Sequence, residues 1–399
     1  MAEEEQTQTR GVGVFLELRK RLQSGLLIVG RDVARNPADV VVSGRDSSLE
    51  VRTPGWELSL SLPAGVAFEQ GSCILTPSGE SSEEELHFRL RITVGKNTDD
   101  DVSDSVMETL RAKETYCFYC QGCQTRLLED RVFKRVLPLP NCNWNAIVDD
   151  WCCHPDPFAK KLLPRAEDCL QGDTYILLAR DGSCSQTLTQ EVSSVETADS
   201  QDQKKTCRRL ALISCSSCSS VLGEAVAPET LKLYITQVVV ETATGDQKLE
   251  ASLNRSGFLE RTVAARLLKL SNSLSTFHFS VQTPDGKAFL LLWLLNSDSI
   301  VASVPEKCIG EESSIISTDP HGPPARAARA LKLLYITCSD ADIQQREIVT
   351  SWDASAIGHP VVLPLKVCEE LLRVIDGSNS TLPASMRHMR SYEVAYLRL

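Results

Sequence analysis

Two pairs of cysteines carry the strongest chemical signal in this chain. Cys120 and Cys123 form one Cys-x-x-Cys pair, and Cys215 and Cys218 form a second. Two such pairs supply the four thiolates of a structural zinc site, which leaves no position open for a substrate. Residues 124–214 separate the pairs, far more chain than the roughly 15–20 residues of a compact zinc ribbon. A shared zinc ion would therefore tie distant segments into one zinc-stapled middle region.

The identity of the zinc ligands has alternatives. Gly122 favours the pair Cys120 and Cys123, because glycine permits the tight turn that points two thiolates inward. The competing interpretation is that paired cysteines are small buried hydrophobic residues without a metal. Other thiols that could replace one of the four ligands are Cys117, Cys152 and Cys207. We expect zinc as a structural cofactor.

A tryptophan-rich segment between the pairs is a second candidate. Trp144, Val148 and Trp151 have the i, i+4, i+7 spacing of one helix face, and Cys153 and His154 follow before a proline-stiffened turn. One interpretation places both tryptophans in the core and assigns the Cys-His pair to the zinc region. The other is a rigid projection that offers a thiolate and an imidazole to a partner.

Cys368 is a third candidate, as a nucleophile. It lies at the start of an expected helix around Leu365–Ile375, where the helix N-terminus and Lys366 would favour a thiolate. Glu369 and Glu370 oppose this, and an ordinary core cysteine is the alternative. The sequence contains no P-loop, dinucleotide fingerprint, His-Glu-x-x-His or Cys-His-Asn signature, so the common enzyme classes lack their usual evidence.

Composition sets the context for these sites. The 399 residues are 42% hydrophobic and 24% charged, as in ordinary globular proteins, and the net charge of −11 argues against direct nucleic-acid binding. The longest apolar run, Ala288–Leu295, is too short to span a membrane. The first residues do not resemble a secretory signal, so the fifteen cysteines indicate a reducing compartment. We expect a cytoplasmic and nuclear protein.

Hydrophobic patterning predicts a mostly β protein of the α+β class in three regions. Short alternating apolar runs between Val12 and Val94 predict a β-sandwich-like domain over residues 1–112. Residues 113–225 form the zinc and Cys-Trp region, with a mobile polar insertion at 183–205. Residues 226–399 are expected to form an α+β domain.

Three elements are predicted within the third region. Leu231–Val240 has the apolar content of one strand, and Gly257–Leu270 has the periodicity of an amphipathic helix. An Asp-Gly turn joins the apolar runs Thr276–Val281 and Ala288–Leu295, which predicts a hairpin.

Several motifs together resemble a known family, the HECT-like ubiquitin ligases that bind ubiquitin-conjugating enzyme, and in particular a vertebrate member. The motifs that carry this resemblance are Phe118-Tyr-Cys-Gln-Gly-Cys123, Arg135-Val-Leu-Pro-Leu-Pro, Trp151-Cys-Cys-His-Pro-Asp-Pro-Phe158, Cys215-x-x-Cys218 with Leu222-Gly-Glu224, and Leu291-Leu-Trp-Leu-Leu-Asn-Ser-Asp-Ser299. The resemblance implies a ubiquitin-protein ligase with a HECT-like C-terminal segment. In it, Cys368 would accept ubiquitin as a thioester from a bound conjugating enzyme.

The resemblance also implies a surface that contacts the conjugating enzyme. Its expected residues are Trp293, Leu294, Asn296 and Asp298. Val367 stands where HECT domains place a threonine before the cysteine, so an adaptor that only positions the charged conjugating enzyme is a further hypothesis.

A second implication concerns Leu137 to about Ala166, which resembles a motif that docks into the zinc-dependent mRNA 3′-end processing endonuclease. Cys153 and His154 would then be offered to the metal centre of that enzyme, with Trp144 and Trp151 as anchors. The alternative function is thus a non-catalytic inhibitor or chaperone of the endonuclease. The expected partners are the conjugating enzyme, ubiquitin and this endonuclease, without a membrane.

Overall fold

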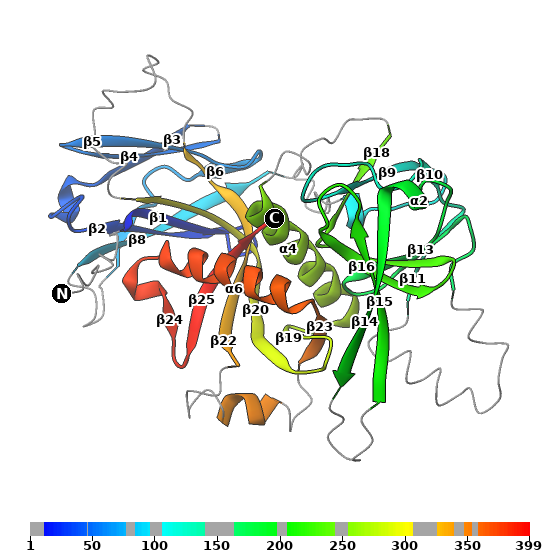
Figure 1. Ribbon diagram of the computed structural model, residues 1–399. Helices are drawn as coiled ribbons and strands as arrows, with labels where there is room; N and C mark the ends of the chain where they lie inside the picture. The colour runs from blue at the N-terminus through cyan, green and yellow to red at the C-terminus, as the bar shows by residue number, and fades with distance from the viewer. Residues whose placement is uncertain are drawn as a thin grey trace, which may run out of the picture. The chain divides into compact units, whose positions relative to one another are not determined.

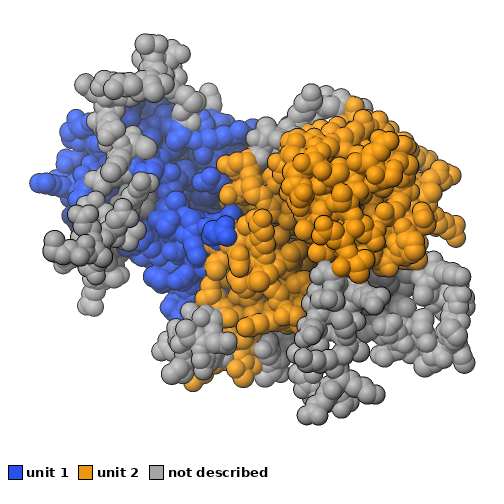
Figure 2. All heavy atoms as spheres, in the orientation of Figure 1, with its two compact units in different colours: residues 1–102, 292–336, 373–399 blue, residues 103–291, 337–372 orange. Residues whose placement is uncertain are grey.

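The computed structural model describes most of the chain as two compact units that are each assembled from separate chain segments (Figure 2). Unit 1 contains residues 1–102, 292–336 and 373–399, and unit 2 contains residues 103–291 and 337–372. The described residues are 12–45, 47–76, 84–95, 106–139, 163–197, 206–243, 254–305, 325–338, 347–352 and 358–399. The mostly β fold class is confirmed, because strands dominate both units (Figure 1).

Unit 1 is built on a long, largely antiparallel sheet with the strand order β24-β25-β22-β20-β1-β2-β8-β6, and β7 pairs with β8. Its strands are β1 (Val12–Arg19), β2 (Ser24–Gly30), β6 (Val66–Phe68), β7 (Ile74–Leu75), β8 (Glu85–Val94), β20 (Ala288–Pro305, in this unit from Leu292), β22 (Ala328–Thr337), β24 (His388–Met389) and β25 (Tyr392–Arg398). A second sheet has the order β21-β5-β4-β3, with β3 (Val41–Arg45), β4 (Ser48–Thr53), β5 (Trp56–Ser61) and β21 (Ala325–Arg326). The short 3-10 helices are η1 (Pro37–Asp39) and η5 (Ala384–Met386).

Side-chain alternation makes unit 1 a sandwich. Leu16 and Leu18 on β1 join Leu49 and Val51 on β4 in one buried cluster, so the two sheets pack face to face. Phe15 points the other way, into a second cluster on the opposite face of the long sheet. The predicted β-sandwich is therefore present. Strands from residues 292–336 complete it, so this unit joins segments that are far apart in the chain.

One charged pair lies inside the long sheet of unit 1. The ammonium group of Lys332 on β22 donates to Glu17 Oε2 on β1 at 3.1 Å, and Ser299 Oγ lies 3.4 Å from Oε1. Glu17 and Lys332 are only 3% and 5% exposed. Burial lowers the pKa of Lys332, and the adjacent Glu17 charge opposes this shift. Each buried charge therefore depends on the other to offset the cost of its removal from water.

Unit 2 contains a seven-stranded sheet in the order β11-β12-β13-β17-β16-β15-β14 and a three-stranded sheet in the order β10-β9-β18. The strands are β9 (Thr115–Cys120), β10 (Arg131–Val132), β11 (Arg135–Pro138), β12 (Asp168–Gln171), β13 (Tyr175–Ala179), β14 (Leu188–Thr197), β15 (Thr206–Cys215), β16 (Val221–Ala227), β17 (Thr230–Tyr234) and β18 (Val238–Thr242). One buried cluster draws on both sheets, including Phe118, Ile176, Leu233 and Val240. Cys120 and Cys215, one cysteine of each pair, belong to this cluster.

One prediction for unit 2 is wrong in detail. Leu231–Val240 is not one strand, because a turn at residues 235–237 sends β17 into the larger sheet and β18 into the smaller. The predicted mobile insertion at 183–205 includes β14, which pairs antiparallel with β15, and its mobility stays a prediction. The polar, threonine- and valine-bearing sequence of β14 fits a strand of which one edge faces solvent.

The amphipathic helix and the hairpin predicted for unit 2 are both present. The predicted amphipathic helix is α4 (Arg255–Leu274), which is capped by the Asn254 side chain. The predicted hairpin is β19 (His278–Gln282) paired with the beginning of β20, and β19 also pairs in parallel with β23 (His359–Val362). Helix α6 (Leu365–Ser380) contributes its residues up to Leu372 to this unit. The shorter helices are α2 (Cys184–Thr187) and η2 (Val106–Glu108). Among the described helices, none has the length and apolarity to cross a membrane.

The buried pair in unit 1 gives a stability prediction. Replacement of Glu17 by Leu leaves the Lys332 ammonium group buried without its counter-charge, and we expect a loss of roughly 3–5 kcal/mol in the free energy of unfolding. Urea titration measures this loss. The double variant Glu17→Leu/Lys332→Met should recover most of it, because no unpaired charge remains in the interior; Arg19, which also lies beside Glu17, is partly exposed. A single variant as stable as the wild-type chain would show that the pair is unimportant.

Candidate functional site

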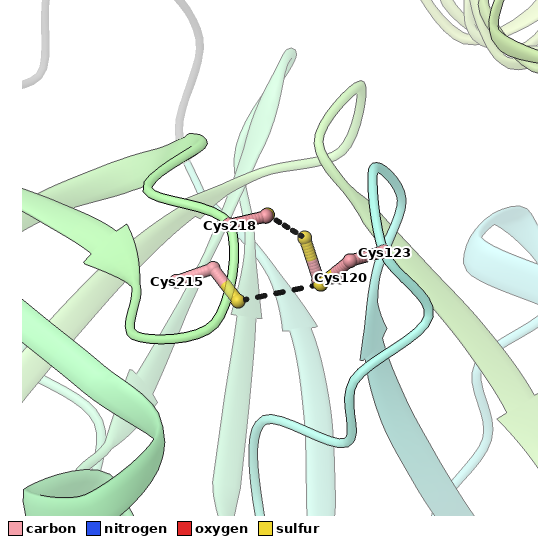
Figure 3. A group of neighbouring side chains, drawn as sticks. All are labelled: Cys120, Cys123, Cys215 and Cys218. Carbon is pink, nitrogen blue, oxygen red and sulfur yellow. Dashed lines mark hydrogen bonds between the residues drawn. The ribbon is translucent and has the colours of Figure 1, made fainter.

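The four cysteines of the two pairs meet at one point in unit 2. Cys120 ends strand β9 and Cys215 ends strand β15, and each is followed by a tight loop that carries the second cysteine of its pair. Figure 3 shows the four side chains converging from these two loops. Cys120 and Cys215 are fully buried, whereas Cys123 and Cys218 are exposed. The predicted ligand set is thus brought together.

The two loops repeat the same backbone pattern. The Cys120 amide donates to Thr125 O at 2.9 Å, and the Gln124 amide donates to Cys120 O at 2.9 Å. Gln124 has a left-handed φ of 59°, which is uncommon for a non-glycine residue. In the second loop the equivalent residues, with the same two 2.9 Å bonds and the same φ, are Cys215, Ser219 and Ser220. The loops are therefore one structural motif used twice.

The sulfur positions fit a single metal ion. Cys120 Sγ lies 3.6 Å from Cys218 Sγ, and Cys123 Sγ lies 3.6 Å from Cys215 Sγ. All four sulfurs lie within 4.8 Å of one another, and none is in a disulfide. A tetrahedron with metal–sulfur bonds of about 2.3 Å has edges of about 3.8 Å, close to these separations. Donor type, number and spacing all agree with a closed structural site.

Burial and local hydrogen bonds shift the pKa values of Cys120, Cys215 and Cys218. Burial raises the pKa of Cys120 and of Cys215, while amide N–H groups within each loop act in the opposite direction. For Cys218, burial is outweighed by the Ser220 hydroxyl, 3.2 Å from Sγ, by its backbone amide and by the neighbouring thiols, which lower the pKa to about 6. Four thiolates this close together require a cation to neutralise them. A metal would therefore bind here most favourably once these protons are lost.

Neighbouring residues explain the choice of ligands. A side chain at Gly122 would place Cβ 3.0 Å from Ser220 Oγ in the opposite loop, so glycine permits the close approach of the loops. Cys117 does not join the cluster, because its Sγ lies 3.0 Å from Asp130 Oδ1. Cys207 lies in the β14–β15 hairpin opposite Glu196, and Cys152 lies outside the described residues.

Cys368 lies in a different environment from that of an activated nucleophile. It is in the first turns of α6 but fully buried, and its Sγ lies 3.5 Å from Leu363 O. Burial raises the pKa of its thiol to about 12, with a smaller contribution from Glu369. The pKa of Cys368 is thus raised, contrary to the lowering expected from the helix N-terminus and Lys366. Acceptance of ubiquitin by Cys368 stays a prediction, and it requires a conformation in which the thiol becomes exposed.

The predicted contact segment for the conjugating enzyme is the part of β20 that belongs to unit 1. Trp293 and Asn296 are half-buried, and the Trp293 ring meets Tyr392 edge-on with centroids 6.2 Å apart. Leu294 is buried, and Asp298 Oδ2 accepts from the Arg21 amide at 2.9 Å. Alternation along the strand places Leu294, Asn296 and Asp298 on one face and Trp293 on the other, so the four residues do not share one face. Their contact with the conjugating enzyme stays a prediction.

The projecting motif cannot be placed in the fold. Trp144, Trp151, Cys153 and His154 lie outside the described residues. Their roles as anchors and as ligands for a partner's metal stay predictions.

Sequence reasoning missed one residue beside the metal site. Arg255, the first residue of α4, donates to Gln121 Oε1 in the first cysteine loop at 3.3 Å and to Glu370 Oε2 on α6 at 2.6 Å. The periodicity predicted the helix over Gly257–Leu270 and so did not include Arg255, and no signal in the sequence paired Arg255 with residues so distant in the chain.

The matched hydroxyls next to the sulfurs give a prediction. Ser220→Ala and Thr125→Val each remove a hydroxyl that lies 3.2 Å from a ligand sulfur, and we expect each to weaken metal binding by about 10–100-fold. Competition with a chromogenic chelator measures this change, and the loss should grow as the pH falls because protons compete for the sulfurs. Ser216→Ala is the matched control, since its hydroxyl donates to Gln186 O instead. Equal affinity of all three variants would show that the hydroxyls are irrelevant.

The sequence of this chain matches a family model and several named proteins. A family model described as HECT-like ubiquitin-conjugating enzyme (E2)-binding matches residues 17–394. A protein named E3 ubiquitin-protein ligase E3D from Mus musculus is 36% identical over 391 residues, covering 97% of this chain and 98% of its own. The proteins of that name from Bos taurus and Homo sapiens are 36% and 34% identical, each over 97% of this chain and 98% of their own. No solved structure shows a significant match. The resemblance noted in the sequence is thereby confirmed, and the chain belongs to the HECT-like E2-binding family.

Proposed function

We propose that this protein is a ubiquitin-protein ligase that binds a ubiquitin-conjugating enzyme and promotes transfer of ubiquitin from it. The observation that carries the proposal is the family match over residues 17–394, together with relatives named as ubiquitin-protein ligases that align with nearly the whole chain. Alignment over this length means that the relatives' fold, and not one isolated motif, is shared.

The buried state of Cys368 favours transfer by positioning. A covalent acceptor must present a thiolate to the incoming thioester. Cys368 is fully buried, and its pKa is raised. In this conformation the residue is therefore neither accessible to the thioester nor ionised. In the positioning mechanism an amine of the substrate attacks the thioester carbonyl directly, and the thiolate of the conjugating enzyme is the leaving group. The ligase then contributes orientation and not a covalent intermediate.

We further propose that zinc occupies the four-cysteine site. Four cysteine sulfurs in two Cys-x-x-Cys loops form a donor set that suits zinc and fills its tetrahedral shell. Such an ion has no open position for a substrate, so its contribution is to folding. Zinc would hold β9 and β15 together and thereby fix the surfaces that the unit presents.

Removal of one buried ligand tests the zinc proposal. Cys120→Ser and Cys215→Ser should each abolish soluble folding of the chain, because binding of a structural metal contributes folding free energy directly. Yield of soluble protein and circular dichroism measure the effect. Cys169→Ser is the matched control, since Cys169 is equally buried in unit 2 but is not one of the four converging cysteines. Soluble, stable Cys120 and Cys215 variants would contradict the proposal.

Replacement of Cys368 tests the mechanism. The chain is incubated with a ubiquitin-loaded conjugating enzyme, and thioester discharge is followed on non-reducing gels. Positioning predicts that Cys368→Ala retains discharge and that the wild-type chain shows no ubiquitin adduct that reducing agents remove. An adduct on the wild type, lost together with discharge in Cys368→Ala, would establish the acceptor mechanism instead. If the wild-type chain fails to stimulate discharge from any conjugating enzyme tested, the ligase proposal itself is wrong.

A further inference from the structure

Arg255 joins three segments of unit 2 that are far apart in the chain. Its Nε and Nη2 donate to Glu370 Oε2 on α6 at 2.8 and 2.6 Å. Its Nη1 donates to Gln121 Oε1 at 3.3 Å and to the backbone oxygen of Thr236 in the turn between β17 and β18. The Arg255 and Glu370 side chains are 29% and 18% exposed, so solvent screens this pair only in part.

Gln121 connects this arginine to the metal site. It lies between the ligands Cys120 and Cys123 and is buried, and its own amide donates to Gln237 O at 3.1 Å. The loop that orients the two sulfurs therefore also fixes the side-chain oxygen that Arg255 uses. Because this loop has a left-handed residue and a close approach at Gly122, it has little freedom to move while its sulfurs are held.

Glu370 connects the same arginine to the buried cysteine. Glu370 lies two positions after Cys368, in the first turns of α6, and Val367, Cys368 and Leu371 on those turns are at most 1% exposed. The Cys368 amide donates to Pro364 O at 3.0 Å, which continues the same turn. A restraint on Glu370 is therefore a restraint on the turn that buries the thiol.

We propose that Arg255 is a latch that couples metal binding at the four cysteines to burial of Cys368. The bound metal fixes Gln121, Gln121 and Thr236 orient the guanidinium group, and the guanidinium group holds the first turns of α6. Charge-assisted hydrogen bonds such as those to Glu370 are the strong ones in proteins, so breaking the chain of contacts at any link loosens these turns. This inference rests on the proposed metal and is independent of ubiquitin transfer.

Thiol labelling tests the latch in the full-length, metal-loaded chain. Gln121→Leu, Arg255→Gln and Glu370→Gln break one link each without touching a sulfur. We expect each to increase the rate of maleimide labelling at Cys368, measured by peptide mass spectrometry, about tenfold. Cys169 is the internal reference, because it is equally buried in unit 2 and far from the latch in sequence. Arg131→Gln is the matched control, since it removes a comparably buried pair with Asp181 at 2.8 Å.

Two labelling results would overturn the latch. One is an unchanged rate at Cys368 in all three variants. The other is a parallel rise at Cys169, or the same rise in Arg131→Gln, because either shows general loosening of the unit.

Metal affinity supplies an independent readout, because coupling between two sites is reciprocal in binding free energy. Glu370→Gln alters no residue of the cysteine loops, yet it should weaken zinc binding in equilibrium competition with a chromogenic chelator. Arg255→Gln should do so to a similar extent, and the double variant should add little, since both substitutions break the same chain of contacts. Wild-type zinc affinity in both single variants would contradict the coupling. If these results hold while ubiquitin discharge is absent, the latch stands and the proposed function fails.

Discussion

The convergence of four cysteine sulfurs is the constraint on which the rest of unit 2 depends. Cys123 and Cys215 are 92 positions apart in the sequence, yet their sulfurs are 3.6 Å apart. A crosslink that closes a loop of this length restricts the unfolded chain strongly, by an amount on the order of 4 kcal/mol in the chain-entropy model used for disulfides. The two cysteines that end β9 and β15 also belong to the buried cluster between the two sheets. The four-cysteine site and the hydrophobic core are therefore one structure.

The same constraint extends toward the C-terminal helix. A cysteine loop that is held in place presents Gln121 to Arg255, and Arg255 in turn holds Glu370 on α6. The residue that the family resemblance selects as a nucleophile, Cys368, lies inside this arrangement and is kept from solvent. In this conformation the thiol is used in packing, which agrees with the proposed transfer by positioning.

Local patterns predicted much of this structure. Each Cys-x-x-Cys pair, the Asp-Gly hairpin before β20 and the amphipathic helix α4 depend on residues near in sequence, and the structure contains the hairpin, the helix and the cluster of the two pairs. The matched loops were not predicted, because Cys-Gln-Gly-Cys-Gln-Thr and Cys-Ser-Ser-Cys-Ser-Ser share only their cysteines and a final hydroxyl. Their likeness resides in backbone conformation, in the φ of 59° at Gln124 and Ser219.

Long-range effects account for the remaining differences. The break between β17 and β18 occurs because the chain passes from one sheet to another, and local propensity does not show it. The two units each include segments that are far apart in the chain, and local patterns do not show which distant segments come together. The pKa of Cys368 depends on burial by residues outside its own helix turn, whereas the sequence showed only the charges beside it.

The four-cysteine centre is the central claim, and X-ray absorption at the zinc edge of the purified full-length chain tests it most directly. We predict one zinc ion per chain with four sulfur neighbours at about 2.3 Å and no nitrogen or oxygen in the first shell. A first shell that contains nitrogen or oxygen, or a folded chain that carries no metal and holds these cysteines as disulfides, would contradict it.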